Sequence, residues 1–440
     1  ARREYAYDNL DLAATVNHLA AYVVAGISDT GHKNFYMYRD TEGDGEWTPL
    51  PWDVDLSAGR RWNSTDKYFD DSSFSNLWIR SPNRLWELIH NTPEFRHMIL
   101  RRIQTLRKEI LLSAADAAAG PDWYKDMVTD LRNQMDPIGI VSDSDLDYTK
   151  WGSWGNNDRS RTAASRLLFE WLIPKRSYMF NAARNQGGVS VPADQISLPP
   201  LTIETVEFLP ASGNQDEEYL VVKNNGGVSV DLSGFTLSGG VDYTFPPGTV
   251  IPAGAGNAGG DYIGTLHLVR DANAFRARST GPTSGEYRFI QEGYQGQFSA
   301  RGETTELRNA EALLVDSFSY TGAPTLAQQG LRVTEVNYHP ADATAAEEVA
   351  LPGVTAEDFE FIELKNISGA TLDLSGAQFT EGIVYTFASG VMLPAGQRLL
   401  LVKNPAAFAV RYPGVTATIA GPYLGLLSND GDTLRLVDGV

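Results

Sequence analysis

The chain has 440 residues, no cysteine, and 36 basic against 55 acidic side chains, which give a formal net charge of −19 and a pI near 4.7. The length predicts roughly two to four domains. The missing cysteines exclude disulfides and thiolate metal sites. The acidic balance argues against a nucleic-acid partner, whose phosphates need a basic face. No apolar run approaches the ~20 residues of a membrane span, so we predict no spanning helix.

The first predicted element is one amphipathic helix over residues 9–25. Its apolar side chains recur at helical spacing, and Asn9 is a residue type that caps helix N-termini. The chain opens on Ala1 rather than Met, from which we expect a fragment or a processed product.

Polar side chains gather in residues 28–59, around two short apolar and aromatic runs. The runs NFYMYR and EWTPLP flank a turn-like DTEGDG segment, which predicts a β-hairpin. Asp29 and Asn34 precede the first strand, and Asp53 and Asp55 follow the second. Asp-x4-Asn, a hairpin and a further Asp is the order of a protein-kinase catalytic segment. Spacing alone favours the alternative, a capped turn with solvated aspartates, because such spacing arises often in an acidic chain.

The same stretch resembles the CotH kinase family, which are spore-coat-type atypical secreted kinases. The resemblance rests on Asp29, on HKN before the YMYRD strand and on PWDVDLSAG after the hairpin. It implies that Asp29 is the catalytic base and that Asn34, Asp53 and Asp55 form the metal site: Asp53 as a ligand, Asn34 as a ligand or a support, and Asp55 as a carboxylate that supports the ligands or binds a second metal. The implied cofactors are Mg²⁺ or Mn²⁺ and ATP. Oxygen ligands of this kind are those that Mg²⁺ prefers. Ala58 departs from the family pattern, which usually has an aromatic residue there.

The resemblance extends weakly to about residue 185. A kinase places its ATP-holding lobe upstream of the catalytic segment, but only 28 residues precede Asp29 and they predict a helix. We therefore expect residues 1–185 to be the C-terminal part of a CotH-like kinase domain without its N-terminal lobe. The expected fold is an atypical protein-kinase-like, mostly helical lobe with a catalytic β-hairpin. It is an enzyme, an atypical protein kinase, if the upstream nucleotide-binding lobe exists.

Further helices are predicted over residues 83–112, 122–136 and 158–184 from their apolar periodicity. A break at Thr92-Pro93 divides the first into two, with Thr92 as N-cap and Pro93 at the first helical position.

Two charged segments among these helices have competing interpretations. Residues 96–108 carry four arginines and a lysine, which predict a solvated basic face; docking of an acidic substrate or of phosphates is the alternative. Residues 143–147 are spaced like the start of a calcium loop. The Gly and Glu of such a loop are missing, so a loop or a helix cap is predicted instead.

The composition of residues 186–200 is that of a linker, rich in Gly, Pro and Ser, and short strands with turns follow.

The β half contains an internal repeat. EYLVVKN at 218–224 recurs as EFIELKN at 360–366, and DLSG at 231–234 recurs at 373–376, in both cases 142 positions later. A constant offset indicates duplication.

Both copies resemble the lamin-tail domain, an immunoglobulin-like β-sandwich. In the second copy the signature is TEVN at 334–337, FEFIELKN ending at Asn366, and LLSNDGD at 426–432. The resemblance implies one sandwich at 201–325 and another at 326–440, which we expect to be truncated. Physically, Ile362 and Leu364 are core residues of the expected sandwich, while Asn366 and the DLSG segment turn the chain. The predicted fold class is thus multidomain, α+β and then all-β.

These resemblances imply two candidate functions. The first is part of a secreted bacterial kinase that transfers a phosphoryl group from ATP to a protein hydroxyl, with β-sandwich modules for attachment. The alternative is a catalytically inactive cell-surface or extracellular-matrix protein with a structural or adhesive role. Expected partners are a protein substrate or a surface or matrix partner, with self-assembly through the sandwiches. Retention of Asp29, Asn34, Asp53 and Asp55 favours the enzyme.

Overall fold

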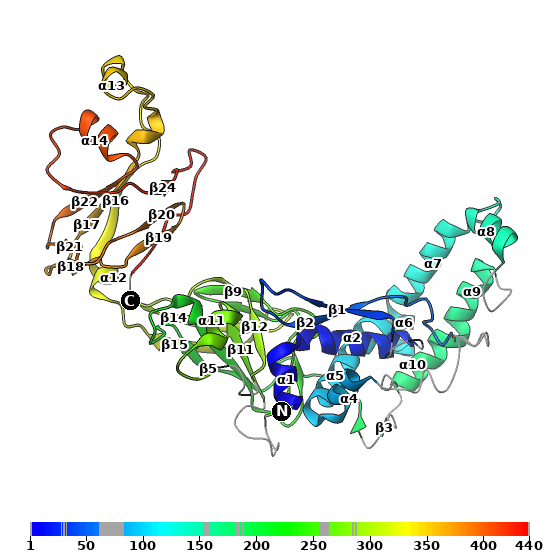
Figure 1. The fold of residues 1–440 in the computed structure, drawn as a ribbon. Coiled ribbons are helices and arrows are strands. Elements are labelled where there is room, and N and C mark those ends of the chain that lie inside the picture. Colours follow the sequence, from blue (N-terminus) through cyan, green and yellow to red (C-terminus); the bar gives the residue numbers. More distant parts are fainter. Residues whose placement is uncertain are drawn as a thin grey trace. The chain divides into compact units, whose positions relative to one another are not determined.

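The computed structural model describes residues 2–438 except 28, 30, 32, 61–82, 153–158, 181–184, 187–188, 255–263, 284–285 and 287. His32 of the motif therefore lies outside the described residues. The architecture mixes helices with sheets and is rich in β-structure toward the C-terminus (Figure 1). Within the described ranges, no helix is long and apolar enough to cross a membrane.

The first helical segment is two helices, α1 (Arg2–Asn9) and α2 (Leu12–Ala25), so the single helix predicted over 9–25 is wrong at its start. Asn9 ends α1, and the N-cap of α2 is Asp11, which accepts a hydrogen bond from Ala14 N at 2.8 Å. The break has a tertiary cause, because Leu10 forms a β-bridge with Trp47 and Asp11 N donates to Trp47 O at 3.2 Å.

The predicted hairpin is confirmed. Its strands β1 (Phe35–Arg39) and β2 (Trp47–Pro51) are antiparallel, with Phe35 opposite Pro51 and Arg39 opposite Trp47. Asp40 shapes the turn, since its Oδ1 accepts from the N–H groups of the second and third residues after it, at 3.0 and 3.1 Å.

Helices continue the chain to residue 180. They are α4 (Arg84–Asn91), α5 (Pro93–Leu106), the π-helical η1 (Arg107–Leu111), α6 (Ala114–Ala119), α7 (Trp123–Met135), α8 (Asp143–Trp151), α9 (Ser160–Arg166), the π-helical η2 (Leu167–Leu172) and α10 (Ile173–Phe180). The division at Thr92-Pro93 is confirmed, although the Thr92 side chain makes no capping hydrogen bond and donates instead to Leu88 O. The calcium-like segment, predicted to be a loop or a helix cap, is the first turn of α8, and the N-cap is the preceding residue, Ser142.

The first β module comprises two larger sheets, a short strand pair and the helix α11 (Ala272–Ala277). One sheet has the order β12-β11-β6-β5 and the other β13-β9-β8-β14-β15, while β7 pairs with β10. The strands are β5 (Leu201–Glu207), β6 (Tyr219–Asn224), β7 (Val230–Asp231), β8 (Thr236–Ser238), β9 (Val241–Thr244), β10 (Val250–Ile251), β11 (Thr265–Val269), β12 (Ile290–Glu292), β13 (Gln295–Gly296), β14 (Gly302–Arg308) and β15 (Leu314–Thr321).

The second β module repeats this plan after α12 (Leu326–Gly330). Its sheets are β16-β17-β22-β23 and β24-β20-β19-β25, with β18 paired to β21. The strands are β16 (Leu331–Asn337), β17 (Phe361–Asn366), β18 (Leu372–Asp373), β19 (Gln378–Glu381), β20 (Ile383–Thr386), β21 (Met392–Leu393), β22 (Arg398–Val402), β23 (Thr418–Ala420), β24 (Leu424–Gly425) and β25 (Arg435–Val437). The pairing pattern is the same in both modules: β11 is antiparallel to β6 and parallel to β12, and β22 is antiparallel to β17 and parallel to β23.

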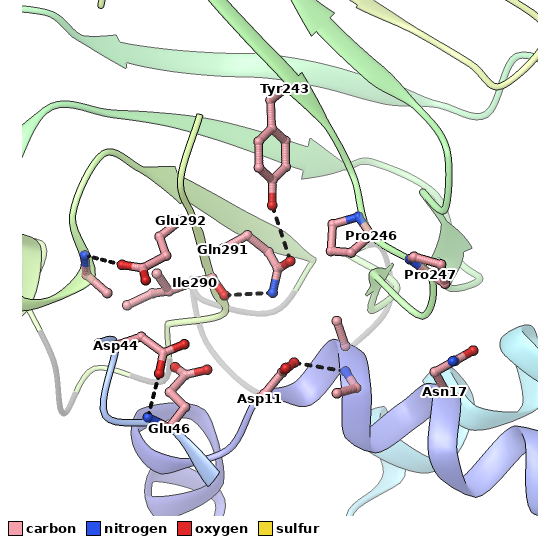
Figure 2. Close-up of a pocket in the computed structure, with 13 residues that line it drawn as sticks. Asp11, Asn17, Asp44, Glu46, Tyr243, Pro246, Pro247, Ile290, Gln291 and Glu292 are labelled. Atoms are coloured by element: carbon pink, nitrogen blue, oxygen red, sulfur yellow. Dashed lines mark hydrogen bonds between the residues drawn. The ribbon is translucent and has the colours of Figure 1, made fainter. Parts of the chain in front are cut away.

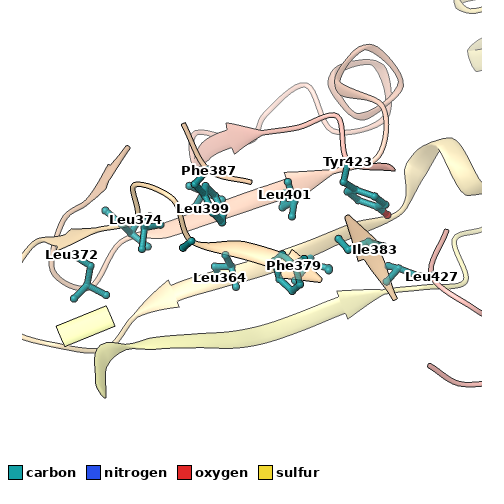
Figure 3. Close-up of a cluster of buried hydrophobic side chains, with 13 residues drawn as sticks. Leu364, Leu372, Leu374, Phe379, Ile383, Phe387, Leu399, Leu401, Tyr423 and Leu427 are labelled. Carbon is teal, nitrogen blue, oxygen red and sulfur yellow. The ribbon is translucent and has the colours of Figure 1, made fainter. Parts of the chain in front are cut away.

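The core of the second module takes side chains from both of its larger sheets. Leu364 and Leu401 come from one, and Phe379 and Ile383 from the other, and all four are at most 1% exposed (Figure 3). The predicted turn residues act as expected: Asn366 Nδ2 donates to two main-chain carbonyls at 2.8 Å, and its Oδ1 accepts from Ser368 N. The duplicated sequence pattern therefore encodes a duplicated set of hydrogen bonds, because Asn224 repeats both amide donations in the first module.

The chain packs into two compact units. One contains residues 1–207, 216–298 and 303–320, and the other contains residues 208–215, 299–302 and 321–440. The helical region and the first β module thus share one unit. The predicted linker 186–200 contributes to it, since Ala193 O accepts from Arg101 and the Asp194 carboxylate from Lys108, each at 2.8 Å. The domain bounds given above stay predictions.

The basic face expected on the second helix of residues 83–112 is corrected in part. Arg101 and Arg102 are 3% and 5% exposed and bind the first β module, so they are not solvated. Arg101 Nε donates to Ser229 O at 2.7 Å, and Arg102 Nη1 donates to Asp231 Oδ2 at 3.1 Å. Burial of an arginine is tolerated here because each guanidinium is paired or hydrogen-bonded.

Candidate functional site

The candidate site begins where α2 ends. Gly26 caps the helix in the left-handed region (φ 63°), and its N–H bonds to Tyr22 O and Val23 O. A Cβ at Gly26 would lie 3.0 Å from Trp171 Nε1, so that indole packs directly on the turn. Lys175, which is fully buried, donates from Nζ to Val23 O at 2.6 Å. Burial lowers the pKa of Lys175 to about 7.

Asp29, Lys33 and Asn34 form one side of the site. Lys33 Nζ lies 3.0 Å from Asp29 Oδ2, and Asn34 Nδ2 donates to Asp29 O at 2.7 Å. Asn34 also accepts at its main-chain oxygen from Trp52 N at 3.3 Å, which ties the start of the hairpin to its end. These bonds fix the loop that carries Asp29 against the segment that carries Asp53.

Asp53 and Asp55 form the other side. Partial loss of hydration, a hydrogen bond with the Asp55 side chain and the Asp55 charge raise the pKa of Asp53. The charge of Lys33 lowers that pKa, and the charge of Asp29 raises it further. The structure therefore brings together the predicted residues Asp29, Asn34, Asp53 and Asp55, which the sequence separates by a hairpin.

The chain then returns to α2. Ala58 N donates to Ala25 O at 2.9 Å, and Gly59 N donates to Gly26 O at 3.4 Å. Ala58, the residue that departs from the motif, is 1% exposed. The two ends of the candidate site are thus anchored at the same helix C-terminus.

The backbone of the site adopts conformations that L-residues rarely hold. Asn34, Asp53 and Ala58 have φ values of 64°, 52° and 53°. In the described part of the chain only Leu112 and Ala312 are further non-glycine residues with positive φ. Such conformations cost free energy and persist where the surroundings impose them, often at functional sites.

The donor set has the chemistry of a site for a hard divalent cation. The charge of Asp55 raises the pKa of Asp53, so two ionised carboxylates would repel each other there unless a cation neutralised them. Over the described ranges, however, no three or more His, Cys, Asp or Glu side chains come together as a metal site. The protein thus presents a carboxylate pair, and Mg²⁺ commonly takes its remaining ligands from water and substrate oxygens. The metal and catalytic roles of these residues stay predictions.

Apart from this site, the structure contains an acidic cavity that was not foreseen from the sequence. It measures about 370 Å³ and lies between α2, the hairpin and the first β module, lined by Asp11, Asp44, Glu46 and Glu292 among others (Figure 2). Arg276 donates hydrogen bonds to Glu46 Oε1 and to Asp44 O, the latter at 2.8 Å. Burial raises the pKa of Glu46 to about 8, against the opposing effect of Arg276. The sequence signal was the acidic turn alone, because Arg276 and Glu292 lie more than two hundred positions away from it.

Comparison with known proteins matches two segments of the chain. Residues 3–123 match the family described as CotH kinase protein, and residues 324–439 match the Lamin Tail Domain. The first match ends before residue 185, and the first β module lies outside the second.

No curated protein matches the chain. Among solved structures, an exo-β-D-glucosaminidase, studied for its inhibition by a glucosamine-configured castanospermine and an amino-australine analogue, aligns at 10% identity. The alignment covers 62% of this chain and 36% of that one, and its TM-score of 0.14 supports no shared fold. The chain therefore contains a segment that matches the CotH kinase family, followed by one that matches the lamin tail domain, in the order that its motifs predicted.

Proposed function

We propose that the chain is part of a secreted CotH-type protein kinase that transfers a phosphoryl group from ATP to a protein hydroxyl. In this proposal the helical region is an atypical kinase-like lobe, and the two β modules are immunoglobulin-like sandwiches for attachment at the cell surface. The observation that carries the proposal is the convergence of Asp29, Asn34, Asp53 and Asp55 on one strained, hydrogen-bonded loop pair. The CotH match over residues 3–123 supports it.

The roles follow from the geometry and from phosphoryl-transfer chemistry. Asp29 orients the acceptor hydroxyl and accepts its proton, and Lys33 Nζ lies 3.0 Å from its Oδ2. Asp53 and Asp55 would hold Mg²⁺ or Mn²⁺, with Asn34 beside them. When bound, the cation neutralises charge on the nucleotide phosphates. Asn34 also keeps Asp29 in register with Asp53 through its bonds to Asp29 O and Trp52 N.

One observation favours the alternative, an inactive surface or matrix protein that assembles through its β modules. The described residues offer a carboxylate pair rather than a larger ligand set. A protein that keeps the loop but binds no nucleotide would show this arrangement.

The test uses the full-length protein with Asp53→Asn and Asp55→Asn variants. We expect Mn²⁺ binding by calorimetry to weaken about tenfold or more in each, and transfer of label from γ-labelled ATP to be lost, because each variant removes one ligand charge. Since the pKa of Asp53 is raised, Mn²⁺ affinity falls with decreasing pH sooner than it would for an ordinary aspartate. Asp40→Asn, in the hairpin turn outside the site, is the matched control.

The outcomes separate the two functions. Metal binding that depends on Asp53, without label transfer in the intact protein, would support the inactive surface protein. Absence of both would contradict the kinase proposal and the metal site together. Equal losses in Asp40→Asn would mean that the effects are not specific to the site.

A further inference from the structure

In the first β module, the β7/β10 strand pair is covered by helices of the same unit. Arg102 of α5 donates to Asp231 Oδ2 and to Ser233 Oγ, both at 3.1 Å. The turn at Gly248 packs so tightly on α2 that a Cβ there would lie 2.3 Å from Ala13 O. This strand pair is thus a binding surface, which we call the seat. It binds a helical surface that presents an arginine beside small side chains.

The second module builds the same strand pair from β18 and β21. Asp373 pairs with Met392 in the register in which Asp231 pairs with Val250. Ser375 N donates to Asp373 Oδ1 at 2.9 Å, and Gly390 N donates to Ser375 Oγ at 2.8 Å. The equivalent bonds of the first module, from Ser233 N and Gly248 N, are both 2.9 Å long. The side chains of the seat therefore have the same local arrangement in both copies.

In the second module the seat is open. Thr371, Asp373 and Gly390 are exposed, and Met392 is 53% exposed where its counterpart Val250 is fully buried. A Cβ built on Gly390 meets no atom of the described residues within 4 Å. Asp373 Oδ2, the counterpart of the atom that accepts from Arg102, makes no hydrogen bond within the described ranges. We name these four residues the β18/β21 face.

We infer that the β18/β21 face binds a helix of another protein, and that this helix presents an arginine to Asp373 and small side chains to Gly390. Charge complementarity specifies the arginine, because the equivalent carboxylate of the first module is paired with one. The exposed Met392 supplies the apolar contact that Val250 makes in the first copy. This inference does not depend on the kinase proposal.

A second copy of this chain is a poor occupant. The arginines that fit the seat, Arg101 and Arg102, are buried against the chain's own first module and would have to leave it. Reuse of a duplicated seat for a different helix requires only that the partner reproduce the chemistry of α5 and α2. The partner is therefore defined by a helical Arg next to Ala, Gly or Ser.

The test uses the full chain and a synthetic probe. The probe is a fluorescent peptide with the sequence of residues 92–111 in which Met98 and Thr105, one turn from Arg101 and Arg102, are replaced by Ala to supply the small side chains. It is stapled on the opposite face, and its helicity is verified by circular dichroism. We expect saturable binding at low salt by fluorescence anisotropy. Asp373→Asn, which keeps the oxygen that accepts from Ser375 N, should raise the dissociation constant about tenfold or more, and so should Met392→Lys. A probe in which Arg101 and Arg102 are replaced by Gln should bind the unmodified chain as weakly as the original probe binds these two variants.

Val384→Lys is the matched control for Met392→Lys. It also places a lysine on an exposed residue of the second module, but on strand β20, outside the β18/β21 pair. It should leave the affinity unchanged. A verified helical probe that does not bind the full chain would overturn the inference. Binding that survives both Asp373→Asn and Met392→Lys would overturn it equally, since the contact would then lie elsewhere.

Discussion

Asn34 combines an unfavourable backbone conformation with two hydrogen bonds that join the halves of the candidate site. Asn tolerates positive φ better than most residues, whereas Ala pays about 1–2 kcal/mol there. We expect Asn34→Ala to lower stability by about 2 kcal/mol, from backbone strain plus the lost bond to Asp29 O. Asn34→Gly, which removes the bond but not the freedom to adopt positive φ, should cost about 1 kcal/mol. Thermal unfolding of the two variants measures the difference, and equal losses would contradict the strain argument.

At the scale of single residues, the motif predicted which side chains converge but not what holds them. The local signal of the hairpin placed Asp29, Asn34, Asp53 and Asp55 at its two ends, and the resemblance to the CotH family singled them out, whereas their spacing alone favoured solvated aspartates. Lys175 gave no signal, since a lysine in a helical pattern is normally solvated. Only the tertiary fold places it under α2, where it binds Val23 O.

Helix α5 is tied to the first β module by a buried ion pair, with the side chains of Arg102 and Asp231 6% and 3% exposed. Removing one partner leaves the other charge buried, which costs about 3–5 kcal/mol. We expect that loss for Arg102→Met and a partial recovery when Asp231→Asn is added, measured as shifts in the thermal midpoint. Asp373→Asn is the control offered by the duplication. Because its carboxylate is exposed, it should cost about 0.5 kcal/mol or less. Equal losses of stability in Arg102→Met and Asp373→Asn would show that burial of the carboxylate does not set the cost.

Elements were predictable where their signals are local. The hairpin, the helix break at Thr92-Pro93 and the 142-residue repeat all came from patterns within a few positions or from direct sequence recurrence. Two predictions failed for one reason. The N-cap moved to Asp11 because Leu10 bridges Trp47, and Arg101 is buried because Ser229 accepts from it. In each case the deciding partner lies tens to more than a hundred positions away.

At the scale of the molecule, the duplication produced two modules with opposite surroundings. One copy is packed into a unit with the helical region, and its strand pair β7/β10 is buried. The other copy belongs to the second unit and keeps the equivalent face open. The sequences of the two seats differ accordingly: Ser229 and Val250 in the covered copy correspond to Thr371 and Met392 in the open one.

The acidic cavity makes the stability of the first unit depend on pH. Burial raises the pKa of Glu46 from 4.5 to about 8, and the pKa values of Asp11 and Glu292 are raised as well, again with burial as the largest cause. Asp44 adds repulsion to all three, and Arg276 is the cation that opposes it at Glu46 and Glu292. Between pH 4.5 and about 8 the folded protein keeps a proton on Glu46 that the unfolded chain releases. The stabilising contribution is therefore complete at the acidic end and is lost as the pH rises through the folded pKa.

We accordingly expect the thermal midpoint of this unit to fall as the pH rises from 5 toward 8. Glu46→Gln, which mimics the protonated carboxyl, should flatten that dependence and raise the midpoint at the alkaline end. Glu42→Gln, on the exposed turn of the same hairpin, should change neither slope nor midpoint. Calorimetric scans of the three proteins across this pH range make the comparison. An unchanged slope in Glu46→Gln would mean that Glu46 is ionised in its pair with Arg276, and the pH dependence would then have to arise elsewhere in the cavity.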